Sequence, residues 1–121
     1  MATAEYLVGI MYHEPEPLAQ WNRGLIEDYE SSTGLFIEAD SSDAAIGWGE
    51  EVGQVLLRHA NGDPTLDWRT LGYYCWLEPS PRESGWGHCL DFFQHVRVGQ
   101  MPDLARMTTA AYRRWLAQRS D

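Results

Sequence analysis

The chain has 121 residues, 44% of them hydrophobic and 12% aromatic, and a formal net charge of −9 at pH 7. This length and composition predict a single globular domain over residues 1–121 rather than a disordered acidic tail. The net charge argues against nucleic acid and anionic membrane as partners, and without a long apolar run or a basic-then-apolar leader we expect a cytoplasmic protein.

The first predicted element is a buried strand over residues 6–12, where the sequence reads YLVGIMY. Pro15 ends the strand region, because proline has no N–H to donate to a ladder. Residues 18–22 then form either a helical turn or a loop. Residues 24–39 are predicted to contain two short strands, joined by a hairpin-sized connection at residues 31–33.

A helix over residues 43–60 has the clearest pattern in the sequence. At 100° per residue, its apolar side chains share one arc with Gly49 and Gly53, and its charged side chains share the opposite arc. Residues 40–42 supply N-cap candidates, and residues 61–64 end the helix. Each glycine costs about 1 kcal/mol relative to alanine, which indicates close approach of a neighbouring element.

Residues 70–77 are rich in β-forming side chains and are predicted to be a strand. Residues 88–98 fit either a strand or a helix, and the valines before Gly99 favour the strand. We expect the two segments to pair as a hairpin. Cys75 and Cys89 are equally far from its turn, so they should be neighbours across the ladder, as free thiols in a reducing compartment.

A last helix is predicted over residues 102–118, where apolar side chains recur at helical spacing. The elements therefore follow the order strand, strand, strand, helix, strand, strand, helix. This order predicts an α+β fold: a mainly antiparallel sheet of four to five strands with two helices on one face.

The stretch from Thr33 to His59, TGLFIEADSSDAAIGWGEEVGQVLLRH, resembles the segment of HicB-type antitoxins in which a strand runs through a short acidic turn into an alanine-containing helix. The resemblance implies a HicB-like, partial RNase-H-like core and a small partner-binding antitoxin with no catalytic residue. The chain departs from that family in the long connection between its first two strands and in its tryptophan-rich second half.

Acidic residues are concentrated in the first half of the chain. Residues 1–67 hold thirteen of the eighteen carboxylates and only two of the nine arginines. Such a field attracts cationic partners, and exposed aromatic side chains beside acid supply anchors for a protein interface. We therefore expect a basic protein partner, such as a nuclease toxin. The residues predicted to bind it are Trp21, Glu27, Asp28, Glu30, Asp43, Glu50, Glu51 and Trp86.

The sequence favours a cytoplasmic inhibitor, an immunity protein or antitoxin, over an enzyme. P-loop, GxSxG and GxGxxG motifs are absent, and the His, Cys and Asp residues within 88–95 lack the spacing of a metal site. No catalytic residue, metal or cofactor is therefore predicted, and the oligomeric state is left open. The alternative is a small enzyme or ligand-binding domain with a cleft lined by Tyr74, Trp86 and His88. A concave pocket with convergent polar groups would favour that alternative.

Overall fold

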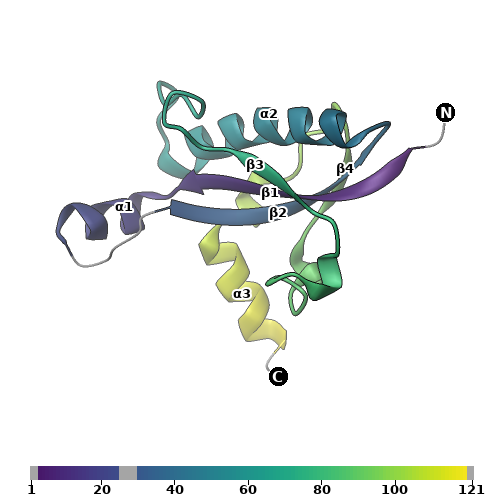
Figure 1. Ribbon diagram of the computed structural model, residues 1–121. Helices are drawn as coiled ribbons and strands as arrows, with labels where there is room; N and C mark the ends of the chain where they lie inside the picture. The colour runs from purple at the N-terminus through teal and green to yellow at the C-terminus, as the bar shows by residue number, and fades with distance from the viewer. Residues whose placement is uncertain (1–2, 25–29, 120–121) are drawn as a thin grey trace.

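Figure 1 shows the computed structural model, which describes residues 3–24 and 30–119. Its helices and strands are β1 (Ala4–His13), α1 (Pro15–Asn22), β2 (Glu30–Ala39), α2 (Ser42–Asn61), β3 (Cys75–Glu78), β4 (His95–Arg97) and α3 (Thr109–Arg119), with short 3-10 helices η1 (Pro81–Glu83), η2 (Leu90–Phe92) and η3 (Leu104–Arg106). The strands form one sheet in the order β3-β1-β2-β4. Only the β2–β4 pair is parallel, so the predicted α+β fold with a mainly antiparallel sheet is confirmed.

The two longest strands, β1 and β2, pair along their whole length, from Ala4 opposite Ala39 to His13 opposite Glu30. The predicted connection at residues 31–33 is wrong, because these residues lie inside β2 and pair with β1. Cross-strand pairing compensates for the weak β-preference of the serines there. The strand predicted at residues 24–30 falls mainly on residues outside the described ranges.

Helix α2 begins and ends where its capping residues predict. The Ser41 side chain accepts a hydrogen bond from the N–H of Ala44 at 3.1 Å, and Gly62 ends the helix with φ of 60°, in the left-handed region. Within the described residues, no helix is both long enough and apolar enough to cross a membrane.

Helix α2 packs on one face of the sheet, and its two buried glycines allow that close packing. A Cβ at Gly49 would lie 2.8 Å from a Val8 methyl carbon, and a Cβ at Gly53 would lie 2.9 Å from the Trp68 ring. The indole N–H of Trp68 donates to the carbonyl of Met11 at 2.6 Å, which holds this ring between helix and sheet. The close approach expected from the sequence is therefore present.

A second, largely aromatic cluster covers the opposite face of the sheet. Leu7, Cys89 and Phe93 are buried in it, and side chains of α3 pack against them. Figure 1 shows α2 on one side of the sheet and α3 on the other. The two helices therefore cover opposite faces, whereas the sequence placed both on one face, because periodicity predicts a buried arc but not which face receives it.

The second half of the chain differs most from expectation. Residues 70–77 form a strand only from Cys75, and residues 88–98 contain η2 and then the three residues of β4. The predicted hairpin is wrong, since β3 and β4 lie at opposite edges of the sheet. Cys75 packs against the α2-side cluster and Cys89 lies in the aromatic one, so the two free thiols are not neighbours.

Candidate functional site

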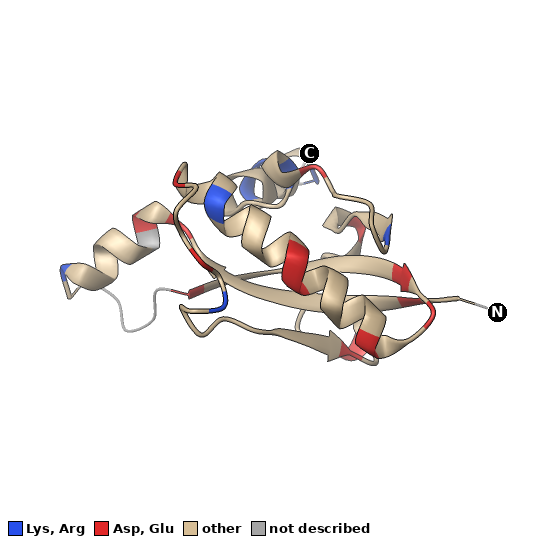
Figure 2. Ribbon diagram, turned by 90° about the horizontal axis from the view of Figure 1, so that it is seen from above, with Lys and Arg blue, Asp and Glu red and all other residues tan. Residues whose placement is uncertain are grey.

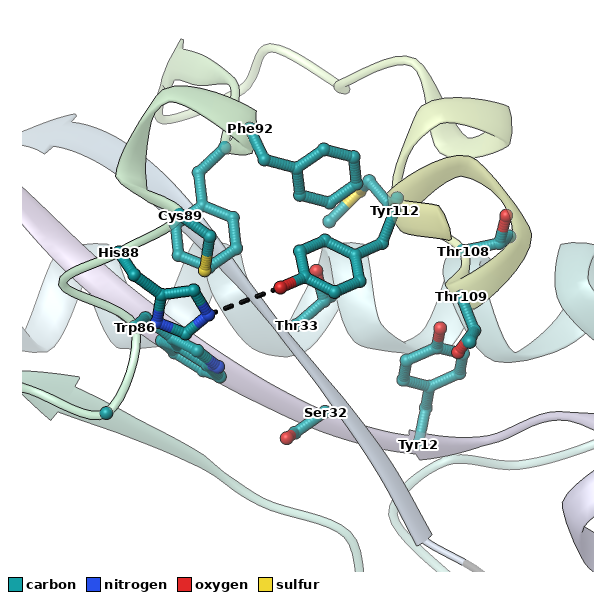
Figure 3. Close-up of a pocket in the computed structure, with 13 residues that line it drawn as sticks. Tyr12, Ser32, Thr33, Trp86, His88, Cys89, Phe92, Thr108, Thr109 and Tyr112 are labelled. Carbon is teal, nitrogen blue, oxygen red and sulfur yellow. Dashed lines mark hydrogen bonds between the residues drawn. The ribbon is translucent and has the colours of Figure 1, made fainter. Parts of the chain in front are cut away.

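A cavity of about 350 Å3 lies between β2, the segment from Gly85 to Phe93 and the N-terminal turn of α3 (Figure 3). This volume is at the lower end of the ~300–1,000 Å3 range of ligand pockets. Aromatic rings form part of the wall, and uncharged polar groups form much of the rest. The rings come from Tyr12, Trp86, Phe92, Phe93 and Tyr112, and the other polar groups from Ser32, Thr33, His88, Cys89, Thr108 and Thr109.

The cavity exists because β4 covers only part of the outer edge of β2. β4 pairs with residues 36–38, and no described strand lies beside the preceding residues of β2. The N–H of Phe36 donates to the carbonyl of Gln94 at 3.0 Å, and so points away from β1. Peptide groups two residues apart point to the same edge of a strand. The N–H and C=O of Ser32 therefore also point to this outer edge, and no other backbone group in the described ranges bonds to them.

Thr33 supplies a hydroxyl to this wall from a residue that is otherwise buried. The residue is only 5% exposed and lines the cavity. Its hydroxyl has no hydrogen-bond partner among the described residues. Among the described residues, no buried side-chain nitrogen or oxygen atom lacks a hydrogen-bond partner, so the Thr33 hydroxyl itself is accessible from the cavity. It can therefore hydrogen-bond a molecule held there.

Three polar side chains meet on the wall opposite β2. His88 Nε2 lies 3.3 Å from the hydroxyl of Tyr112, as the dashed line in Figure 3 marks. The thiol of Cys89 belongs to the same wall. Burial raises the pKa of the Cys89 thiol, which keeps it protonated at neutral pH. A nucleophilic cysteine requires a lowered pKa, so this wall offers hydrogen bonds rather than a thiolate.

The N-terminus of α3, where a helix favours negative charge, is already occupied by Glu14. The backbone N–H of Thr109 donates to Glu14 Oε2 at 3.2 Å, and the Thr109 hydroxyl donates to the other carboxylate oxygen. The pKa of neighbouring Tyr12 is raised, first by burial and then by the negative charge of Glu14.

No aspartate, glutamate, lysine or arginine lines the cavity among the described residues, so the cavity suits an uncharged molecule.

The acidic residues predicted to bind a partner are only partly brought together. Asp43, Glu50 and Glu51 lie on α2, where Figure 2 shows acidic segments on the helix and basic ones on α3. Glu30 is exposed at the start of β2, and Glu27 and Asp28 lie outside the described residues. Arg69 pairs with both helix acids at the middle of α2, its Nη2 lying 3.5 Å from Glu50 and 3.8 Å from Glu51. Part of the acidic field is therefore neutralised locally.

The two predicted tryptophan anchors lie in different environments. Trp21 is 43% exposed on α1. Trp86 is half-buried in the aromatic cluster, stacked on Trp76 with ring centroids 5.8 Å apart and edge-on to Phe93 at 5.1 Å. It lies on the face of the sheet opposite α2, away from the helix acids, because the aromatic cluster rather than solvent receives its ring.

The cleft considered as an alternative is partly recovered. Trp86 and His88 do line the cavity, whereas Tyr74 is 54% exposed and packs near Trp76 outside it. Sequence reasoning missed the polar residues of β2 and α3, since 31–33 was assigned to a turn. The adjacent threonines at 108–109 could have indicated the start of a helix, because threonine is a good N-cap residue. In the structure the Thr108 hydroxyl accepts a hydrogen bond from the N–H of Ala111 at 3.3 Å.

The residues considered as metal ligands point to different partners. His95 hydrogen-bonds Glu5 through Nδ1 at 2.7 Å, His88 contacts Tyr112, and Cys89 is buried. Across the ranges described here, no group of three or more His, Cys, Asp or Glu side chains is arranged to hold a metal ion. The absence of a resident metal stays a prediction for elemental analysis.

Comparisons with protein-family models, with curated proteins and with solved structures find no match for this chain. The resemblance of Thr33–His59 to HicB-type antitoxins therefore stays a prediction. β2 and α2, which span that stretch, do follow one another as strand and helix, but this succession is general among α+β folds.

Proposed function

We propose that this protein binds a small, uncharged molecule that combines an aromatic or apolar surface with hydrogen-bonding groups. The observation that carries the proposal is a cavity of about 350 Å3 lined by aromatic rings and uncharged polar groups, among them the hydroxyl of Thr33, which is accessible from the cavity. Aromatic walls provide apolar contact area, and a few placed polar groups provide orientation, which is the usual composition of a ligand site.

Binding is favoured over covalent chemistry at this site. Burial raises the pKa of the Cys89 thiol, and the hydrogen-bond partner of His88 in this wall is the Tyr112 hydroxyl. A thiolate nucleophile needs a nearby base and a lowered pKa. The arrangement instead supports a rigid wall that positions a ligand without reacting with it.

The test is a titration of 15N-labelled protein with a panel of uncharged one- and two-ring compounds. Binding should shift the amide signals of Ser32 and Thr33 and the indole signal of Trp86. Replacing Thr33 by valine keeps the shape and removes the hydroxyl, so it should weaken binding about five- to tenfold. The matched control is Thr70→Val, whose exposed hydroxyl bonds the carbonyl of Asp67 away from the cavity.

Two results would count against the ligand-binding function. One is a panel in which no compound shifts the signals of the cavity residues. The other is an equal loss of affinity in Thr33→Val and Thr70→Val, since an effect common to both variants would come from general destabilisation and not from the cavity hydroxyl.

The acidic outer side of α2 supports a second candidate, an inhibitor that binds a basic protein. Asp43 and Glu51 are exposed there, near Asp40 at the end of the preceding turn. Reversing Glu50 and Glu51 to arginine should abolish capture of a basic protein at ~0.01 M salt, where the Debye length is about 30 Å. Asp91→Arg, on η2 away from α2, is the charge control. Equal capture by all three proteins would rule this candidate out.

A further inference from the structure

We infer that the ligand is a planar, uncharged heterocycle with a hydrogen-bond donor beside an acceptor on one edge, the chemistry of a free nucleobase or a cyclic amide. The recognition element is the outward peptide edge of Ser32 in β2. This inference rests on the proposed function and deepens it, because it names the class of molecule that the cavity takes.

The peptide edge of Ser32 presents a donor and an acceptor to one side. In an extended strand, the N–H and C=O of one residue point to the same edge. A neighbouring antiparallel strand hydrogen-bonds both groups with its own C=O and N–H. Here β4 stops short, and no described strand lies beside Ser32. A flat molecule with an amide-like edge can make the same two bonds in the plane of the sheet.

The hydroxyl of Thr33 adds a third polar contact next to that edge. A hydroxyl both donates and accepts, and this one has no partner among the described residues. The Thr33 side chain leaves β2 on the α2 face, because Thr33 pairs with Ile10 of that face. The Ser32 N–H and C=O and the Thr33 hydroxyl thus define a polar strip along the outer edge of β2.

Aromatic rings line the cavity on the face of the sheet opposite α2, and they favour a flat ligand. Phe92 and Tyr112 meet edge to face with ring centroids 5.3 Å apart, and Trp86 stands edge-on to Phe93 at 5.1 Å. Every heterocyclic base has a π-face that stacks on such rings. The ring of Phe93 lies against Gly34, the residue after Thr33, where an added Cβ would come within 2.6 Å of it.

The charge of the site excludes a phosphorylated form of the ligand. The anion-binding position at the N-terminus of α3 is filled by Glu14 through two hydrogen bonds from Thr109. None of the described residues lining the cavity is an arginine or lysine. The class is therefore a free base or cyclic amide, and a nucleotide is disfavoured by the net charge of −9 as well.

The experiment uses hypoxanthine, 1-methylhypoxanthine and inosine 5′-monophosphate as probes, titrated into the full chain and followed by 15N NMR. Hypoxanthine should bind through its adjacent N–H and carbonyl. The methylated base, which lacks that N–H, should bind at least about tenfold more weakly, as should the monophosphate.

Two substitutions at one position test the peptide edge itself. Ser32→Pro removes the outward N–H, and proline is tolerated where a strand edge is unpaired; it should weaken hypoxanthine binding at least about tenfold. Ser32→Ala keeps the N–H and removes only the side-chain hydroxyl at the cavity wall, so it should weaken hypoxanthine binding clearly less than Ser32→Pro does. If Ser32→Pro does not fold by circular dichroism, the methylated base supplies the same comparison in the native chain.

The outcomes separate this inference from the function on which it rests. Equal binding of hypoxanthine and its methyl derivative, or unchanged binding in folded Ser32→Pro, would overturn the peptide-edge reading. If other uncharged ring compounds bind in a Thr33-dependent way while hypoxanthine does not, only the proposed ligand class is wrong. If no ring compound shifts the signals of the cavity residues, the ligand class and the ligand-binding function are both wrong.

Discussion

Two glycines of α2 should respond with opposite sign to the same substitution. At Gly47 an added Cβ meets no heavy atom within 4 Å, whereas at Gly53 it would lie 2.9 Å from Trp68 Cε2 and Nε1 and 3.1 Å from Ile10 Cγ2. Alanine favours a helix over glycine by about 1 kcal/mol. Gly47→Ala should therefore raise the free energy of unfolding by roughly 0.5–1 kcal/mol.

At Gly53 the packing cost exceeds that gain. Trp68 is 1% exposed and cannot move toward solvent without leaving its place between α2 and the sheet. Overpacking a core costs about 1–3 kcal/mol, and displacing the ring weakens its hydrogen bond to the Met11 carbonyl, worth about 0.5–1.5 kcal/mol. After the helix gain of about 1 kcal/mol is subtracted, Gly53→Ala should lower the free energy of unfolding by about 0.5–3.5 kcal/mol.

Urea unfolding followed by tryptophan fluorescence measures both variants on one scale. A destabilised Gly53→Ala with a stabilised Gly47→Ala would support the close packing of α2 on the sheet. If both substitutions stabilise the protein by the same amount, the ring of Trp68 does not lie against Gly53, and the placement of α2 would be refuted.

Three further outcomes follow from individual side chains. Burial lowers the pKa of His13, so the unfolded chain takes up its proton first. The contribution of this group to stability is therefore present above the unfolded-state pKa of ~6.5 and is lost as the pH falls from there through the lower folded-state pKa. His13→Gln should remove that part of the pH dependence of urea unfolding. Burial raises the pKa of Cys75 to about 12, and Cys89 is 3% exposed on the other side of the sheet. Neither thiol should therefore react with a thiol reagent at pH 8 before the protein unfolds. Mild oxidation should form no disulfide between the two. Ser41→Ala removes the N-cap of α2 and should cost about 1 kcal/mol in urea unfolding, whereas Ser42→Ala, one residue into the helix, should change stability by less than about 0.5 kcal/mol.

Helix α2 and strand β1 were predictable because their signals are local. The arc of apolar residues, the Ser41 cap and the Gly62 stop act within a few residues of one another, so the sequence of that stretch alone contains the reason for the helix. The strand at residues 6–12 was predictable for a similar reason, since a run of aliphatic and aromatic side chains is typical of a buried strand in the centre of a sheet.

Strand partners were not predictable in the same way. Residues 31–33 have turn-like composition, yet they lie in β2 because β1 offers them a complete ladder. Residues 95–97 form a strand only where they meet β2 in parallel, on the far side of the sheet from β3. Both outcomes depend on contacts between segments far apart in the chain, which neither propensity nor periodicity contains.

The candidate site was determined almost wholly at the tertiary level. The sequence by itself established the acidic character of the chain, the aromatic content of its second half, and the presence of Trp86 and His88 as cleft candidates. Only the folded structure decided that β4 stops short of Ser32 on the outer edge of β2, so that no strand of the described ranges covers it, and that the Thr33 side chain lines the same cavity. The physical reason is that a cavity is made by elements failing to pack completely, and the extent of that packing is set by contacts across the fold rather than by any segment alone.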